Sequence, residues 1–263
     1  MFCLIKFTLK SGDSMSEEKE VILWNFLYAL ARNGQICRNF TLVKQGDYCA
    51  YVTLPKPDSL DTSHDGVYVK QFRAEVENYF GLSAHMLGEN AQSQPHCNCK
   101  THTALEMQTY SDDCDSVFTC LDCGRPVAMY ELPAIDDEDD FSEVETWQEN
   151  FASMDKIWMN CLCDRYSGRQ LTDPLSALNK QGRDIASRMA QKLNCKVYYN
   201  MYDDLGYYTK KPKWVESGGA MFRICPSCGK LMRHFDNGVC CTELCDACNL
   251  SSDLYGGDEE RKT

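Results

Sequence analysis

Long apolar runs are missing from this 263-residue sequence. None approaches the roughly 18 to 20 apolar residues that a membrane-spanning helix requires. The start, residues 1–7, is apolar for only a few positions and then turns polar, which is too short for the apolar region of a signal peptide. We therefore expect a cytoplasmic protein without a membrane partner.

Histidine is also scarce, and the five histidines form no recognisable hydrolase motif. The metalloprotease pattern His-Glu-x-x-His does not occur, and no His-x-Glu lies upstream of Cys225 as a zinc deaminase requires. A cysteine nucleophile beside a histidine from elsewhere in the chain stays an open alternative, because such pairs need not be close in sequence. The sequence predicts a binding protein and not an enzyme.

Basic residues are outnumbered, with 27 Lys and Arg against 39 Asp and Glu and a net charge of −12. Nucleic-acid-binding domains normally carry a basic excess, so any such contact requires a local patch here. The most acidic run, Asp136 to Asp140, is typical of a solvated linker. The alternative is that this run steers association with a basic protein partner, as in an adaptor or an antitoxin-like immunity protein.

Cysteine, in contrast, is abundant, with seventeen residues. An odd count cannot pair completely within one chain, and disulfide scaffolds are usually shorter, so we expect free thiols in a reducing compartment. Sixteen residues separate Cys225-Pro-Ser-Cys228 from Cys245-Asp-Ala-Cys248. This is the spacing of a four-thiolate zinc site, and four cysteines leave no open position, so the zinc is predicted to be structural.

A second cysteine cluster lies upstream. Twenty residues separate Cys97-x-Cys99 from Cys120-Leu-Asp-Cys123, and this spacing predicts a second structural zinc site. Several alternatives stay open: His96, His102 or Cys114 as a ligand here, Cys240 or Cys241 in place of Cys245, and an iron–sulfur cluster in place of zinc.

The fold class predicted from the patterns is α+β. Residues 2–9 read as a strand, 21–31 as a helix that Ser14 to Glu17 caps, 42–54 as a hairpin around Gly46, and 69–79 as a helix that Gly81 closes. This order fits a ferredoxin-like unit, with a last strand just downstream. We expect four parts: a ferredoxin-like domain at 1–95, a first zinc ribbon at 96–135, an acidic linker and helical segment at 136–195, and a second ribbon at 196–263.

The helical segment begins with an apolar stripe over residues 141–163, which indicates one long helix. Cys161 and Cys163 lie near its end and are predicted to be buried thiols. Tyr166-Ser167-Gly168 is expected to break the chain. One or two further helices follow, with Gly182 as a candidate joint, and residues 197–202 read as a strand.

A local basic patch lies in the second ribbon, because residues 196–236 hold seven Lys or Arg against four acids. Bases interleaved with aromatic residues can bind the phosphates and stack on the bases of RNA or single-stranded DNA. The alternative is that the aromatic residues form the small core of the ribbon. The candidate nucleic-acid-binding residues are Lys210, Lys211, Lys213, Arg223, Lys230 and Arg233, with Tyr208 and Trp214 for stacking.

Several short motifs stand in a specific order along nearly the whole chain. They are Asn33-Gly34-Gln35-Ile36, Pro57-Asp58-Ser59-Leu60, the Cys97–Cys123 cluster with its tail Pro-Val-x-x-Tyr-x-Leu-Pro, Leu175-Ser176-x-Leu178, Gly182-Arg183, Tyr198-Tyr199 and the closing Cys-Pro-x-Cys-Gly. In these motifs the chain resembles a bacterial family of zinc-ribbon-containing proteins. That family is classed as a domain of unknown function, and a nucleic-acid-binding role has been suggested for it. The resemblance implies zinc ribbons and a nucleic-acid partner.

Overall fold

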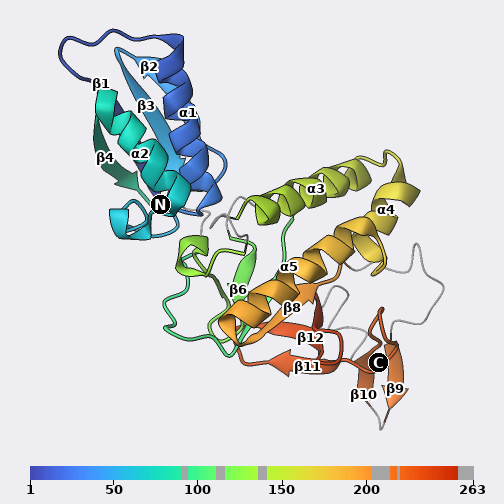
Figure 1. Cartoon of the computed structure of the whole chain (residues 1–263). Helices are drawn as coiled ribbons and strands as arrows, with labels where there is room; N and C mark the ends of the chain where they lie inside the picture. Colours follow the sequence, from blue (N-terminus) through green and yellow to red (C-terminus); the bar gives the residue numbers. More distant parts are fainter. Residues whose placement is uncertain (90–93, 111–115, 136–140, 203–213, 218–219, 254–263) are drawn as a thin grey trace. The chain divides into compact units, whose positions relative to one another are not determined.

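A computed structural model describes residues 1–89, 94–110, 116–135, 141–202, 214–217 and 220–253 (Figure 1). The chain folds into two compact units that do not follow the sequence order. Unit 1 contains Met1–His96, Cys114–Ser116 and Pro126–Ser142, and unit 2 contains Cys97–Asp113, Val117–Arg125 and Glu143–Thr263. Residues 126–135, which follow the first cysteine cluster in the sequence, therefore belong to the first unit.

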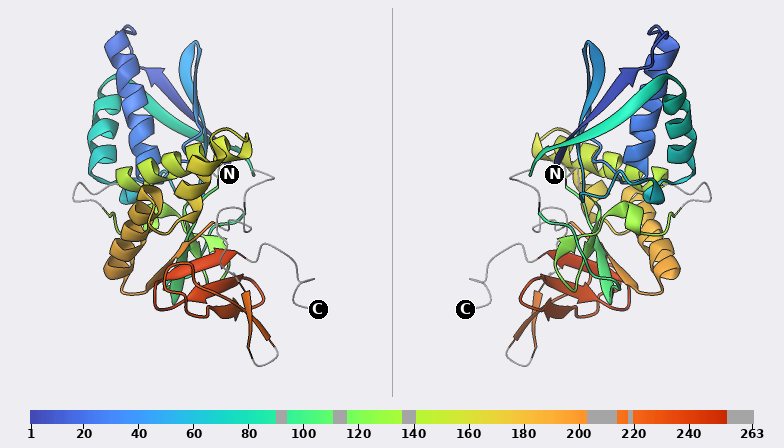
Figure 2. Two further views of the ribbon diagram at one scale, coloured as in Figure 1. Left: turned by 90° about the vertical axis from the view of Figure 1, so that its right-hand side faces the viewer. Right: turned by 90° about the vertical axis from the view of Figure 1, so that its left-hand side faces the viewer.

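Unit 1 is a four-stranded antiparallel sheet in the order β2-β3-β1-β4, and Figure 2 shows its two long helices on the same face. Alternate side chains of β1, Cys3, Ile5 and Phe7, are buried in its core with Leu23 and Val76 of the helices. The elements are β1 (Phe2–Leu9), α1 (Glu17–Arg32), β2 (Thr41–Gln45), β3 (Asp47–Thr53), η1 (Thr62–His64), α2 (Val67–Tyr79), β4 (Phe80–Gly88) and the later η2 (Met129–Glu131).

The predicted order of strand, helix, hairpin and helix is confirmed in unit 1. Helix α1 is capped by Ser16, whose hydroxyl oxygen accepts the backbone N–H of Lys19 at 3.3 Å, which is within the predicted capping segment. Gly81 does not close α2, because the helix ends at Tyr79 and Gly81 already belongs to β4. Strand β4 pairs with β1 and completes the sheet.

Unit 2 is built on a seven-stranded mixed sheet in the order β11-β12-β13-β8-β5-β6-β7. The central strand β8 runs parallel to both neighbours, whereas the hairpins on either side are antiparallel. A separate two-stranded sheet pairs β9 with β10. The strands are β5 (Ala104–Met107), β6 (Phe118–Cys120), β7 (Arg125–Pro126), β8 (Lys196–Asn200), β9 (Trp214–Ser217), β10 (Ala220–Arg223), β11 (Arg233–Asp236), β12 (Cys241–Cys245) and β13 (Leu250–Asp253).

Three helices precede β8 in the sequence: α3 (Ser142–Met159), α4 (Asp164–Thr172) and α5 (Ala177–Leu193). Helix α5 packs against β8, as the views in Figures 1 and 2 show. The contact is tight because Gly182 faces the rings of Tyr199 and Trp147, both of which are fully buried. Among the helices that the structure describes, none has the length and apolar character needed to cross a bilayer.

Two local predictions in the helical segment are wrong. The first helix ends at Met159, and Cys161 and Cys163 are exposed residues with left-handed backbone instead of buried thiols. The segment Tyr166-Ser167-Gly168 lies inside α4 and does not break the chain. Of the alternatives of one or two helices, the structure has the single helix α5, which continues through Gly182.

Candidate metal centres

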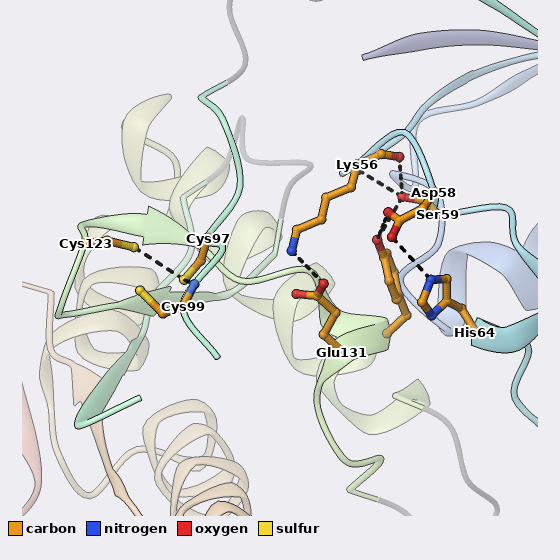
Figure 3. Close-up of polar contacts among 9 residues, drawn as sticks. Lys56, Asp58, Ser59, His64, Cys97, Cys99, Cys123 and Glu131 are labelled. Atoms are coloured by element: carbon orange, nitrogen blue, oxygen red, sulfur yellow. Dashed lines mark hydrogen bonds and ion pairs between the residues drawn. The ribbon is translucent and has the colours of Figure 1, made fainter. Parts of the chain in front are cut away.

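The first cysteine cluster gathers four thiols from one loop and one turn. Cys97 and Cys99 precede β5, whereas Cys120 ends β6 and Cys123 lies in the turn to β7. Their sulfur atoms all lie within 4.8 Å of one another. The Cys97 and Cys123 sulfurs are 3.4 Å apart, and Figure 3 shows them side by side with Cys99.

The second cluster repeats this arrangement. Cys225 and Cys228 lie between β10 and β11, whereas Cys245 ends β12 and Cys248 lies in the turn to β13. These four sulfurs also lie within 4.8 Å of one another, with 3.7 Å between Cys228 and Cys245. Cys245 is thus the clustered residue. Cys240 and Cys241 lie outside both four-cysteine clusters, and Cys114 lies outside the described residues.

The backbone turns tightly at each Cys-x-x-Cys pair. In all three pairs the residue after the second cysteine has a positive φ: Gly124 at 68°, Gly229 at 71° and Asn249 at 50°. Glycine adopts this conformation without steric cost, and asparagine tolerates it better than most residues. The local sequence therefore prepares each turn to direct two thiols toward one point.

Both clusters are arranged like metal sites. In tetrahedral zinc–thiolate sites with bonds of about 2.3 Å, neighbouring sulfurs lie about 3.8 Å apart, close to the 3.4 and 3.7 Å seen here. Burial raises the pKa of Cys97 to about 11 and raises those of Cys120 and Cys225 further. Buried thiols of this kind become thiolates only beside a positive charge, which a metal ion supplies.

Two further side chains support the first cluster. His102 contributes Nδ1 at 3.3 Å from the Cys120 sulfur, so it lies beside the cluster and not among the four mutually close thiols. Asp122 accepts the backbone N–H of Thr103 at 2.8 Å and also contacts the Thr103 hydroxyl. These bonds attach the Cys120–Cys123 turn to the strand that follows Cys99, and they hold the two halves of the ligand set together.

The corresponding turn of the second cluster is held through Asp246. Its carboxylate accepts the Tyr198 hydroxyl at 2.5 Å and Nε of Arg233 at 2.7 Å, and it also contacts the Lys196 ammonium group. The hydrogen bonds from Arg233, Lys196 and Tyr198 hold the pKa of Asp246 well below its usual range. Asp246 thereby connects the Cys245–Cys248 turn to β8 and β11.

We expect Asp246→Asn to lower the free energy of unfolding of unit 2 by about 1–2 kcal/mol at pH 7. The substitution weakens the three partly exposed contacts with Tyr198, Arg233 and Lys196, and each of them contributes part of this free energy. A carboxyl group whose pKa is lowered by folding stabilises the folded state fully at pH values above its unfolded pKa of about 3.9. This stabilisation is lost as the pH falls from there through the lower pKa of the folded state. The difference from wild type should therefore stay constant between about pH 5 and 8. Urea unfolding followed by tryptophan fluorescence measures it.

The matched control for this prediction is Asp184→Asn, which removes only the exposed pair with Arg188 within α5. That substitution should lower the free energy of unfolding by less than about 0.5 kcal/mol. A stability difference for Asp246→Asn that fades between pH 7 and pH 5 would contradict the assignment of a depressed pKa.

The two metal-site regions touch each other within unit 2. The side-chain amide of Asn237, in the turn between β11 and β12, donates to the backbone oxygen of Leu121 at 2.8 Å. A Cβ on Gly124 would lie 2.6 Å from Val239, so the same turn packs closely on the first cluster. Leu121, Tyr198 and Leu244 form a shared core cluster. The sequence does not predict this coupling, because the spacing of the cysteines in one cluster carries no information about the other cluster.

The residues predicted to bind nucleic acid differ in exposure and in whether another side chain already pairs with them. Lys230 is exposed beside Cys228. Arg233 is exposed but bonded to Asp246, and Arg223 is 5% exposed. Trp214 begins β9. Lys210, Lys211, Lys213 and Tyr208 lie outside the described residues, as does the acidic run 136–140.

Polar contacts in unit 1, partly buried and partly exposed, bring together three of the motifs noted in the sequence. The side-chain amide of Gln35 donates to the backbone oxygen of Ser59 at 2.8 Å, and the Tyr130 hydroxyl donates to Asp58 at 3.0 Å. Lys56 pairs with Glu131 at 2.6 Å, as Figure 3 shows. The contacts of Tyr130 and Glu131 attach residues 126–135 to the rest of unit 1, so the motifs that contain these residues have a structural role here.

Comparisons with known proteins match two family models to separate parts of the chain. Residues 1–87 match a domain of unknown function (DUF8589), and residues 99–202 match another domain of unknown function (DUF2310). The second match includes Cys99, Cys120 and Cys123 of the first cluster and ends before the second cluster.

Two relatives from Haemophilus influenzae, each described as an uncharacterized protein, are 31% and 30% identical over 110 residues. The alignments cover 41% of this chain and 39% and 50% of the relatives, so the chain spans half or less of their length. A solved structure, Rv0793 from Mycobacterium tuberculosis, aligns with 35% of this chain and 97% of its own at 15% identity and a TM-score of 0.25.

Proposed function

We propose that the protein is a non-enzymatic, zinc-stabilised binding protein of the bacterial cytoplasm. In this proposal unit 1 is a ferredoxin-like domain, and unit 2 is a pair of zinc ribbons fused into one sheet. The observation that carries it is the composition of the two clusters, each with four cysteines within 4.8 Å of one another. Four thiolates complete a tetrahedron around zinc, so no position is left for a reactive water.

The proposed partner is RNA or single-stranded DNA, bound along the second ribbon. Its support is the basic and aromatic sequence that leads into β9, with Lys210, Lys211 and Lys213 for phosphates and Tyr208 or Trp214 for stacking. Lys230 adds an exposed charge beside Cys228. Arg223 is left out of the proposed surface because it is buried, and Arg233 is secondary because Asp246 already neutralises it.

Fluorescence anisotropy with labelled single strands over a salt series tests this partner. We expect binding at low salt that weakens steeply as salt increases, because each phosphate contact releases counterions. The triple variant Lys210→Ala, Lys211→Ala, Lys213→Ala should reduce the log–log slope by about 2, since each contact contributes about 0.7 on single strands. Changing the exposed lysines Lys44, Lys70 and Lys180 to alanine is the charge-matched control and should leave the slope unchanged.

Absence of binding at low salt, by protein that retains two metal equivalents, would overturn the nucleic-acid partner but not the structural zinc sites. The net charge of −12 then favours the alternative, a basic protein partner steered by Asp136–Asp140. Reversing the charge of that run should slow such association while the metal content stays the same.

A further inference from the structure

A third group of metal-binding side chains lies on the β11–β12 hairpin, apart from both four-cysteine clusters. In the antiparallel register His234 faces Glu243, and Asp236 faces Cys241. Directly opposed residues share a face of a sheet, as do residues two apart on one strand. All four side chains therefore project from one face of the hairpin.

Three of the four present donor atoms to one point. The ligand atoms of His234, Asp236 and Cys241 lie within 4.8 Å of one another, and all three residues are exposed. The His234 Nε2 and Cys241 Sγ atoms are 4.0 Å apart. A tetrahedral zinc ion with bonds of about 2.0 Å to nitrogen and 2.3 Å to sulfur separates these atoms by about 3.6 Å. Small side-chain rotations close the remaining gap.

The fourth residue, Glu243, orients the histidine. Its carboxylate is buried, with 3% of the side chain exposed, and it lies 3.0 Å from His234 Nδ1. An ionised carboxylate only accepts, so this bond is donated by Nδ1–H, and Nε2 is the ring nitrogen directed toward Cys241. Metal-binding histidines almost always make such a bond through the ring nitrogen that does not bind the metal.

The turn that joins the two strands holds Asp236 and Cys241 in place. Asp236 Oδ1 accepts the Gly238 N–H at 2.8 Å, which leaves the second oxygen of the carboxylate as a donor for a metal. Asn237 accepts the Val239 and Cys240 N–H groups and donates to Leu121. The donors are thus held by backbone that is bonded on both sides.

We propose that His234, Asp236 and Cys241 form a third metal site for an exchangeable divalent ion of the zinc class, with Glu243 as the positioning residue. One imidazole, one carboxylate and one thiolate suit zinc and its neighbours in the first transition row. Binding releases the Cys241 thiol proton to solvent. Three protein ligands leave a fourth position for water, so this ion exchanges more readily than those in the closed clusters.

Cys241, His234 and Glu243 also resemble a thiol nucleophile, its histidine base and the carboxylate that orients the base. Asp236 favours the metal site. A second carboxylate beside the sulfur disfavours a free thiolate but adds a third ligand to a cation. We therefore treat the nucleophile as an outcome of the test.

The probe is Co²⁺, added to full-length protein that already holds two zinc equivalents by elemental analysis. Wild type should bind one further equivalent, with a sulfur-to-cobalt charge-transfer band of single-thiolate intensity. Cys241→Ser and His234→Ala should lose that equivalent and keep both zinc ions. Cys240→Ser, which changes the neighbouring half-buried thiol, is the matched control and should keep it. Glu243→Gln should retain the stoichiometry with about 10- to 100-fold weaker affinity.

Wild-type protein that binds no third equivalent overturns the proposal, as does a third equivalent that persists in Cys241→Ser with its thiolate band. The proposal also fails if no metal binds and iodoacetamide alkylates Cys241 faster in wild type than in His234→Ala, which would identify a nucleophile–base pair. The retained zinc shows in each variant that unit 2 is folded. The test does not depend on any nucleic-acid partner.

Discussion

Replacing Cys245 by serine should remove one metal equivalent and unfold most of unit 2, including the strands around the first cluster. A structural zinc contributes about 10–16 kcal/mol to folding in zinc-finger peptides at pH 7. A whole domain is stable by only about 5–15 kcal/mol. Cys245 is 2% exposed. The free energy lost with its thiolate and the metal should therefore exceed the free energy of unfolding that the rest of unit 2 provides.

The loss should spread because the two clusters share one sheet. Strand β8 pairs with β13 on one side and β5 on the other, so it connects the ribbon of Cys245 to the ribbon of Cys120. The bond from Asn237 to Leu121 and the shared core of Leu121 and Leu244 add contacts that both clusters need. We expect one cooperative transition for unit 2 and not two independent ones.

Elemental analysis and hydrogen exchange measure this outcome. In Cys245→Ser, amide protection should fall in β12 and β13 and also in β5 and β8, while β1 and β3 of unit 1 stay protected. Cys161→Ser is the matched control, because that thiol is exposed and outside both clusters. It should retain two metal equivalents and full protection. Exchange that increases only in β12 and β13 would contradict the coupling.

Gly182→Ala should destabilise unit 2 by about 2 kcal/mol, even though alanine is the better helix former. A Cβ at this position would lie 2.3 Å from a ring carbon of Tyr199 and 2.6 Å from Nε1 of Trp147. Neither ring can move easily, because both are buried and Tyr199 donates its hydroxyl to Asn179 at 2.8 Å. The overpacking cost of about 3 kcal/mol exceeds the helix gain of about 1 kcal/mol.

Thermal unfolding tests the Gly182 prediction, with an expected Tm decrease of about 4–8 °C for a unit of this size. Gly81→Ala is the control, because an added Cβ there meets only the backbone oxygen of Thr8 at an ordinary 3.8 Å. An unchanged or raised Tm in Gly182→Ala would mean that α5 does not lie as close to β8 as described.

Local patterns account for much of what the sequence predicts correctly. Alternating apolar residues in 2–9 and the turn at Gly46 specify β1 and the β2–β3 hairpin within a few residues. The spacing of the cysteines predicts the two sets of four that the structure brings together, because a Cys-x-x-Cys turn brings two thiols together without help from distant residues. The choice of Cys245 over Cys240 or Cys241 needed the structure. Features that depend on distant contacts could not be predicted, as at Gly182, where the neighbouring ring of Tyr199 leaves no room for a Cβ.

The sequence by itself determined the four Cys-rich segments, the α+β class and the order of elements in unit 1. Only the tertiary structure decided that both clusters belong to one sheet through β8 and that residues 126–135 belong to unit 1. It also decided that His234, Asp236, Cys241 and Glu243 share one face. The physical reason is the sequence separation of the residues that interact. Turns and helix or strand periods arise from neighbouring residues, whereas strand partners and burial are settled only when distant segments pack.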